Sequence, residues 1–210
     1  NASFTIDNSY RILASDRDAN DGFGGSVAID GNYALVGANK NHISNIADAG
    51  SAYLYKFSES GNGLSIDNSY RILASDREAD DWFGVSVAIN GNYALVGARG
   101  TDEGGSMTGS AYLYKFSENN NVLSIDNSFR ILASDRDDYD YFGWSVAING
   151  SYALVGAWGN DEGGNTAGSA YLYKFSESGN ASFIIDNSYR ILASDGNASD
   201  EFGKSVAING

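Results

Sequence analysis

The sequence of 210 residues contains no cysteine and no proline, and it has a single histidine. Without cysteine there can be no disulfide framework, no thiolate metal site and no cysteine nucleophile. Without proline, the turns must be made by glycine, asparagine, aspartate and serine. No run approaches the roughly 20 apolar residues of a membrane-spanning helix, so membrane insertion is not expected. We therefore expect a fold held together by side-chain packing and strand pairing.

Basic residues are also scarce. The chain has 13 Lys and Arg against 27 Asp and Glu, which gives a formal net charge of −14. Nucleic-acid binding is not expected, because neutralising phosphates requires clustered Lys and Arg. A solvated acidic surface explains the charge in the simplest way, and cation binding is the more specific alternative.

Internal repetition is the dominant feature of the sequence. The stretch FGVSVAINGNYALVGA at residues 83–98 has close copies at residues 23–38 and 142–157, and FGKSVAING at residues 202–210 repeats its first half. The Phe-Gly pairs begin at 23, 83, 142 and 202, so the period is about 60 residues. This period is too long for a β-helix and too short for a β-sandwich.

Each unit is interpreted as four short strands, from the alternation of apolar and small residues between turn residues. In the second unit the predicted strands cover residues 83–89, 93–98 and 110–116, followed by a long strand that ends at residues 129–134. Asn90-Gly91 predicts a type I′ hairpin turn, in which both central residues need positive φ. No segment has helical periodicity over the ~10 residues that a helix needs. The predicted fold class is all-β.

Four antiparallel strands per unit, repeated without helices, are typical of the blades of a β-propeller. The small residues of the first strand suit an innermost position, where blades converge. The predicted organisation is a single propeller segment over residues 1–210, in the following parts. Full blades are predicted at residues 23–75, 83–134 and 142–194, with the outer strand (1–15) and the inner strand (202–210) of an incomplete blade. Three blades do not close a ring of the usual four to eight, so we expect further repeats or another copy to complete it.

Four motifs recur in a fixed order through the chain. They are aromatic-Arg-Ile-Leu-Ala-Ser-Asp, Asp-x-Phe-Gly-x-Ser-Val-Ala-Ile, Tyr-Ala-Leu-Val-Gly-Ala and Gly-Ser-Ala-Tyr-Leu-Tyr. This pattern resembles the FG-GAP repeat, in the version found in bacterial secreted and surface proteins and related in fold to the integrin α-subunit propeller. The resemblance implies an extracellular or cell-surface propeller, commonly seven-bladed, that acts in adhesion or recognition. The calcium loop of the integrin type, Asp-x-Asp-x-Asp-Gly, is not matched by the short connection at residues 90–92.

Pairs of aspartates recur five residues apart before each Phe-Gly motif. Loop oxygens at this spacing could bind a hard cation such as calcium. The favoured alternative is that these side chains accept hydrogen bonds from nearby backbone amides and shape the loop, because calcium needs six to eight oxygen ligands. No cofactor is then required. The calcium candidates are Asp76, Asp81, Asp135 and Asp140.

The nearly identical units differ at three positions beside the Phe-Gly and Gly-Ala motifs, and all three tryptophans of the chain lie there. Trp and Arg at loop edges are frequent binding anchors, and a Trp ring stacks on sugars or cations. Blade-to-blade packing with neutral drift is the alternative explanation. The candidate ligand-binding residues are Trp82, Arg99, Tyr141, Trp144 and Trp158.

Catalysis has little support in the sequence. His42 is the only histidine, it lies in an irregular loop, and no nucleophile motif accompanies it. The sequence therefore predicts a non-enzymatic adhesion or recognition scaffold with a protein or glycan ligand. Two alternatives stay open. One is a carbohydrate-binding propeller with a shallow pocket at each blade interface, and the other is a purely structural module that associates with itself.

Overall fold

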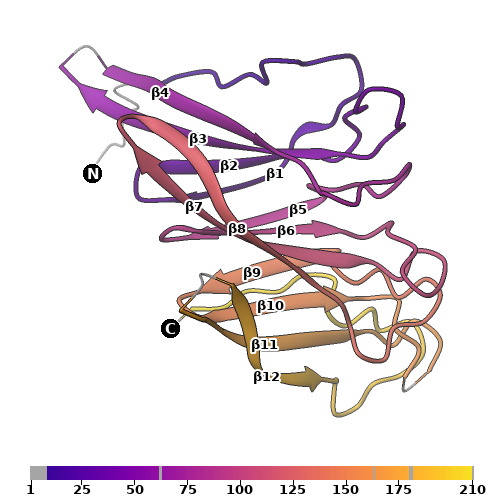
Figure 1. The fold of residues 1–210 in the computed structure, drawn as a ribbon. Coiled ribbons are helices and arrows are strands. Elements are labelled where there is room, and N and C mark those ends of the chain that lie inside the picture. Colours follow the sequence, from indigo (N-terminus) through magenta and orange to yellow (C-terminus); the bar gives the residue numbers. More distant parts are fainter. Residues whose placement is uncertain (1–8, 62, 163, 180–181, 210) are drawn as a thin grey trace, which may run out of the picture.

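The computed structural model describes residues 9–61, 63–162, 164–179 and 182–209. Over these ranges the chain forms strands and no helix, which confirms the all-β prediction. The strands form three antiparallel sheets of four consecutive strands each (Figure 1). A membrane-spanning helix is not found in the described parts of the chain.

The three sheets repeat the same order of strands. The first contains β1 (Phe23–Asp30), β2 (Tyr33–Ala38), β3 (Ser51–Ser60) and β4 (Gly63–Ile72). The second contains β5 (Ser86–Asn90), β6 (Tyr93–Ala98), β7 (Ser110–Asn119) and β8 (Val122–Ile131). The third contains β9 (Ser145–Asn149), β10 (Tyr152–Ala157), β11 (Ser169–Glu177) and β12 (Phe183–Ile191).

The hairpin turn between β5 and β6 lies one residue later than predicted. Asn90 pairs with Tyr93, so the central residues are Gly91 and Asn92. Only Gly91 has a positive φ, of 57°, and these φ signs fit a type II′ turn with glycine first. The predicted type I′ pattern occurs instead between β7 and β8, where Asn120 and Asn121 both have positive φ.

The first strand of the second sheet begins at Ser86, three residues after its predicted start. The reason is that Phe83 forms a parallel bridge with Gly50 of the preceding sheet. The amide of Val85 also donates to the carbonyl of Trp82 (3.1 Å), which turns the chain before it enters the sheet. The fourth strand, β8, ends at Ile131 rather than at residue 134.

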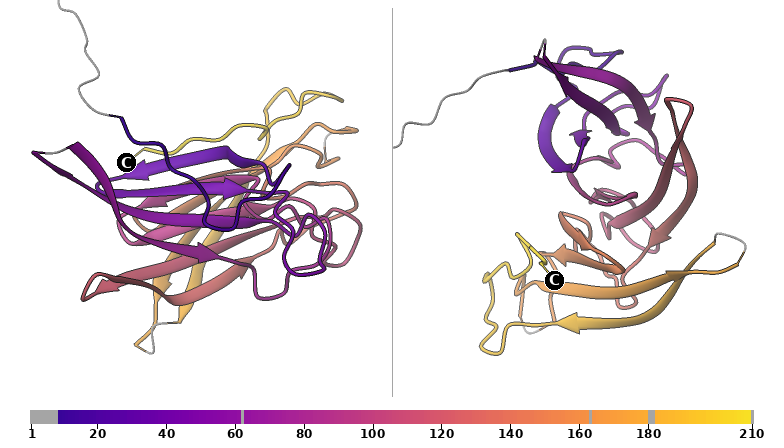
Figure 2. Two further views of the ribbon diagram at one scale, coloured as in Figure 1. Left: turned by 90° about the horizontal axis from the view of Figure 1, so that it is seen from above. Right: turned by 90° about the vertical axis from the view of Figure 1, so that its left-hand side faces the viewer.

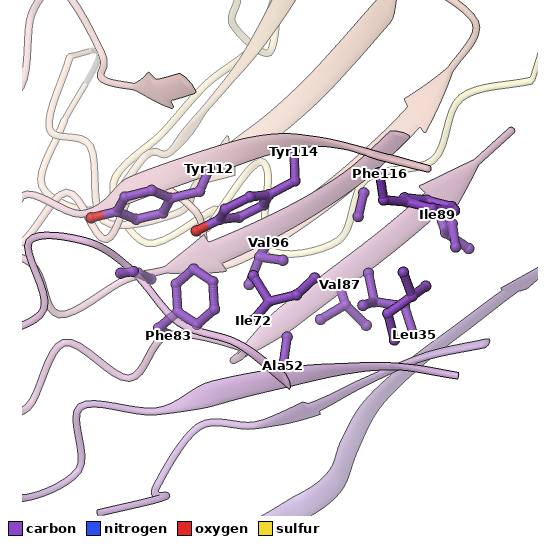
Figure 3. Close-up of a cluster of buried hydrophobic side chains, with 14 of the residues drawn as sticks. Leu35, Ala52, Ile72, Phe83, Val87, Ile89, Val96, Tyr112, Tyr114 and Phe116 are labelled. Atoms are coloured by element: carbon purple, nitrogen blue, oxygen red, sulfur yellow. The ribbon is translucent and has the colours of Figure 1, made fainter. Parts of the chain in front are cut away.

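The hydrophobic core lies between neighbouring sheets. Leu35, Leu54 and Ile72 of the first sheet are buried against a second-sheet face that includes Val96 and Tyr112 (Figure 3). The opposite face of the second sheet packs in the same way on the third. The middle sheet is therefore covered on both faces, as the alternation along its strands predicts.

The innermost strands are β1, β5 and β9, which pack beside one another. The right-hand view in Figure 2 shows the three sheets following one another around an open arc. Glycines in the second strand of a sheet allow the Phe-Gly motif of the next unit to approach closely. A Cβ atom built on Gly97 would lie 1.9 Å from the carbonyl oxygen of Gly143, and one on Gly156 would lie equally close to that of Gly203. Ser86 Oγ donates to the same Gly143 oxygen at 2.8 Å.

The two predicted terminal strands are not strands in the described residues. Residues 9–15 and 204–209 are irregular, because no neighbouring strand of an incomplete blade is present to accept their hydrogen bonds. Ile12 and Ala14 nevertheless pack on the first sheet, as Ile72 and Ala74 pack on the second. Residues 1–8 and 210 lie outside the described ranges. The number of blades in a complete ring, and its closure, stay predictions.

Candidate functional site

The five candidate ligand-binding residues meet at one end of the sheets, where β5 begins and β6 ends. Arg99 follows β6, and its guanidinium carbon lies 4.0 Å from the ring centroid of Trp82 and 4.4 Å from that of Trp144. It is therefore held between a ring of its own unit and a ring of the next. These are cation–π distances.

The contacts continue across the third sheet. The rings of Tyr141 and Trp158 stack with centroids 5.1 Å apart and an interplanar angle of 12°. Trp144 meets Trp158 edge to face at 5.4 Å. Lys204 Nζ lies 5.3 Å from the Trp158 centroid and pairs with Glu201. We call this set the aromatic-cation ladder, and its members are Trp82, Arg99, Tyr141, Trp144, Trp158 and Lys204.

The backbone before each Phe-Gly motif is left-handed. Trp82 has a φ of 52° and Tyr141 a φ of 54°, a conformation that costs about 1–3 kcal/mol for a residue other than glycine. A loop of the preceding sheet holds it. The amide of Trp82 donates to the carbonyl of Asp48, and that of Tyr141 donates to the carbonyl of Met107, both at 3.1 Å. The fold itself therefore aims these rings into the ladder.

The ladder is largely a packing element. Its five predicted members are all half-buried, and the indole N–H groups of Trp82 and Trp158 are buried without a hydrogen-bond partner. Burial also lowers the pKa of the Arg99 guanidinium below its usual value. The rings contact one another within the third unit, and Arg99 joins them to Trp82 of the second, which supports the packing alternative. Only the outer rim of the ladder is open to a ligand.

Tyr139 extends that rim. It was not among the candidate residues that were selected from the differences between units. Its side chain is 52% exposed, and its ring lies 6.3 Å from that of Tyr141. The corresponding residues in the other units are Asn20, Asp80 and Ser199. The residue at the position of Tyr139 therefore differs between units in the same way as the residues at the ladder positions, and this difference could have identified it.

A second feature repeats at the opposite end of the sheets, beside the hairpin turns. A groove of about 500 Å³ between the first and second sheets is lined by Tyr33, Phe116 and Glu118, among others. A groove of about 540 Å³ between the second and third sheets is lined by the equivalent Phe175 and Glu177. Each described sheet interface thus has one shallow, open groove.

The second aspartate of each pair shapes its own loop. Asp81 Oδ2 accepts a hydrogen bond from the amide of Glu78 at 2.6 Å, and Asp140 Oδ2 accepts one from the amide of Asp137 at 2.8 Å. Both carboxyl groups are buried. This is the loop-shaping role that the sequence favoured.

The first aspartate of each pair joins neighbouring units. Asp76 accepts a hydrogen bond from the hydroxyl of Tyr112 (3.0 Å) and pairs with Arg130 (2.8 Å) of the second sheet. Asp135 does the same with Tyr171 and Arg190 of the third. Within the described residues, no group of three or more His, Cys, Asp or Glu side chains could hold a metal ion. Calcium binding stays an untested prediction.

We expect the protein to become more stable as the pH falls from 7 to 5. Burial raises the pKa of Asp140 to about 6, and that of Asp81 likewise, above the value of about 3.9 for an unfolded aspartate. The folded state then binds protons more readily than the unfolded chain, so stability rises as the pH falls through 6. The gain is about 1 kcal/mol for each carboxyl, or roughly 3 °C in melting temperature.

Thermal unfolding at pH 7 and pH 5 measures this effect. Asp140→Asn should remove about half of the rise, whereas Asp80→Asn, which removes an exposed charge, should keep it. Hydrogen bonds from Lys56 and Lys115 lower the pKa of Glu118 and Glu177, so loss of those ion pairs falls below pH 4.5 and outside this window. An equal rise in Asp140→Asn and the unsubstituted protein would contradict the assignment.

His42 also has a local structural role. Its Nδ1 accepts a hydrogen bond from the amide of Asp48 at 2.9 Å. That bond lies inside the loop whose Asp48 carbonyl accepts from Trp82. The histidine therefore supports the loop that orients the start of the ladder.

The chain was compared with known families and proteins. A family model described as the FG-GAP repeat matches residues 8–55, 67–114, 127–173 and 187–210, which is well over half of the chain. The second, third and fourth matches begin in β4, β8 and β12, so the second and third matches each include strands of two sheets. No curated protein matches the chain at a significant level.

Proposed function

Because the chain belongs to the FG-GAP repeat family, we propose that it is a non-enzymatic scaffold for extracellular adhesion or recognition, within a larger propeller. The observation that carries this proposal is where the units differ. The core positions are nearly invariant between units, and among the positions that differ, those of the ladder and Tyr139 are brought together at one end of the sheets. Loops on a rigid scaffold are where proteins place binding residues.

The rim suits a protein or glycan ligand. The ring of Tyr139 and the exposed parts of the ladder rings form an aromatic surface. Such a surface stacks on apolar surfaces and on sugar rings. Lys204 is exposed and lies beside these rings, where it pairs with Glu201. A ligand with an apolar or sugar face matches this arrangement.

Glycan binding is a second candidate function, and the repeated grooves favour it. Each groove combines a half-buried tyrosine, Tyr33 or Tyr93, with a glutamate carboxylate, and repetition of a weak site raises avidity for a polymer. A glycan array separates the candidates. Glycan binding that persists when the rim residues of the ladder are substituted indicates binding in the grooves. An array that shows no glycan binding argues against this function.

Tyr139→Ala is expected to weaken ligand binding about tenfold or more, as for a truncated aromatic hot spot. The substitution is better than truncation of a ladder tryptophan, because Tyr139 is exposed and its loss leaves sheet packing intact. Binding of the labelled chain to a glycan array and to immobilised extracellular-matrix proteins is the measurement. Tyr70→Ala, which removes an exposed tyrosine from β4, is the matched control. Equal binding of both variants would contradict a ligand role for the rim.

A further inference from the structure

Neighbouring sheets share a repeated polar contact. Glu118 of the second sheet accepts a hydrogen bond from the hydroxyl of Tyr33 (3.1 Å) and pairs with Lys56 (2.6 Å) of the first. Glu177 of the third sheet does the same with Tyr93 (2.6 Å) and Lys115 (2.6 Å) of the second. Each sheet therefore offers a glutamate on one side and a Tyr-Lys pair on the other.

The outer face of the first sheet and the outer face of the third sheet each carry one side of this contact without the other side. Glu59 of the first sheet corresponds to Glu118 and is exposed. Tyr152 and Lys174 of the third sheet correspond to Tyr33 and Lys56, and both are exposed. The described residues provide no hydrogen bond or ion pair to any of these three side chains. One end of the arc is thus complementary in charge to the other.

The apolar surface at the first sheet is also uncovered. Val27 and Ile29 are 67% and 68% exposed, whereas the equivalent Val87 and Ile89, which pack against the first sheet, are 7% and 8% exposed. Ile29 also lines an apolar pocket of about 180 Å³ on this side of the first sheet. A sheet that covered this face as the first sheet covers the second would bury both side chains.

The third sheet carries the side chains that such a cover requires. Residues 189–194, at its outer strand, read YRILAS, and residues 10–15, which now lie on the first sheet, read the same. The third sheet of another molecule can therefore replace Ile12 and Ala14 with the identical Ile191 and Ala193. The incoming third sheet would also cover the first sheet with its other strands.

Side-chain size matches at the ladder end as well. Inside the chain, Arg99 meets Tyr141 and Trp144, the residues that flank the next Phe-Gly motif. In the proposed contact the larger Trp158 takes the place of Arg99. The residues that flank the facing motif are then Gly22 and Gly25, which take the place that Glu201 and Lys204 of the same chain now occupy beside Trp158. The two glycines leave room for the indole ring.

We propose that the third sheet of one molecule packs on the first sheet of a second copy of this chain, with Glu59 bound to Tyr152 and Lys174 of the partner copy. The contact repeats the internal sheet interfaces. It displaces residues 9–15 from the first sheet, and it displaces residues 199–209 from the third sheet, where Phe202 now bridges to Gly168 and Ser145 Oγ donates to the carbonyl of Gly203. It is heterologous, so it forms either a closed ring or an open filament. Two copies bring six sheets, within the four to eight of closed propellers. A closed dimer with two identical interfaces is the expected product.

Sedimentation equilibrium tests the assembly. The chain should behave as a dimer, with twice the mass of the 22.3 kDa monomer, at micromolar concentration. Glu59→Lys and Lys174→Glu should each weaken the dimer at least tenfold, because each places like charges opposite one another at both interfaces. Lys40→Glu, at an exposed loop residue, is the control for charge reversal and should leave the dimer intact.

Two rescue experiments make the test specific. An equal mixture of the Glu59→Lys and Lys174→Glu variants should form dimers, because each interface then joins opposite charges. The double variant should dimerise alone for the same reason. A monomer of 22.3 kDa at 100-fold higher protein concentration would overturn the proposal. Failure of both rescues, with each variant folded by circular dichroism, would also overturn it.

Discussion

Replacement of Gly97 by alanine should lower the free energy of unfolding by about 3 kcal/mol, the upper end of the range for overpacked cores. The new Cβ atom would lie 1.9 Å from the backbone oxygen of Gly143 and 2.3 Å from Ser86 Oγ. Neither neighbour can yield cheaply. The first belongs to the backbone of the next sheet, and the second is held by its hydrogen bond to that same oxygen. Strand β6 and the Phe-Gly motif of the next unit would have to separate.

Urea unfolding followed by tryptophan fluorescence measures this loss. Gly61→Ala is the matched control, because a Cβ atom added there would meet no other atom within 4 Å and the φ of Gly61 is not in the left-handed region. That variant should be close to the unsubstituted protein in stability. If both variants unfold at the same urea concentration, Gly97 is not in close contact with the backbone of Gly143.

The second large effect is expected for Phe83→Ala, which should cost about 3–5 kcal/mol. The Phe83 ring is fully buried, with its centroid 5.4 Å from the ring of Tyr112 and 6.1 Å from that of Tyr114. Its backbone forms the bridge to Gly50 of the preceding sheet. The truncation therefore opens a cavity in the core between two sheets.

Phe23→Ala is an informative comparison for this prediction. Phe23 meets Tyr53 and Tyr55 in the same geometry, at 5.5 Å and 6.4 Å, but it is only half-buried. Its loss should cost clearly less than that of Phe83, and the difference measures what a preceding sheet contributes. Equal costs, measured by the same unfolding experiment, would show that the ring acts only within its own sheet.

Much of the fold could be predicted from the sequence, because its determinants are local and repeated. Alternation along residues 110–116 predicts that Tyr112 and Tyr114 face one neighbour and Leu113 the other, and the core clusters confirm this. The start of β5 could not be predicted in this way. Phe83 has the alternation of a strand residue, but its pairing with Gly50 is a contact between units, and local alternation carries no information about it.

The candidate site was predicted in part. Variation between units identified residues that the structure brings together, including Arg99 between Trp82 and Trp144. It did not reveal that these residues contact one another more than they contact solvent, because burial at a sheet interface depends on the angle between sheets. Tyr139 differs from its counterparts as much as Tyr141 does, and only exposure singles it out.

The ladder has a consequence for how such a chain folds correctly. Neighbouring units with nearly identical sequences are prone to domain swapping and misassembly, because one unit fits the place of another. Arg99 distinguishes them, since it fits between two indole rings whereas its counterpart Asn39 carries no charge to place there. If the first unit docked directly on the third, the cation–π contacts of Arg99 would be lost. The residues that differ between units thus favour the correct order of units within one molecule.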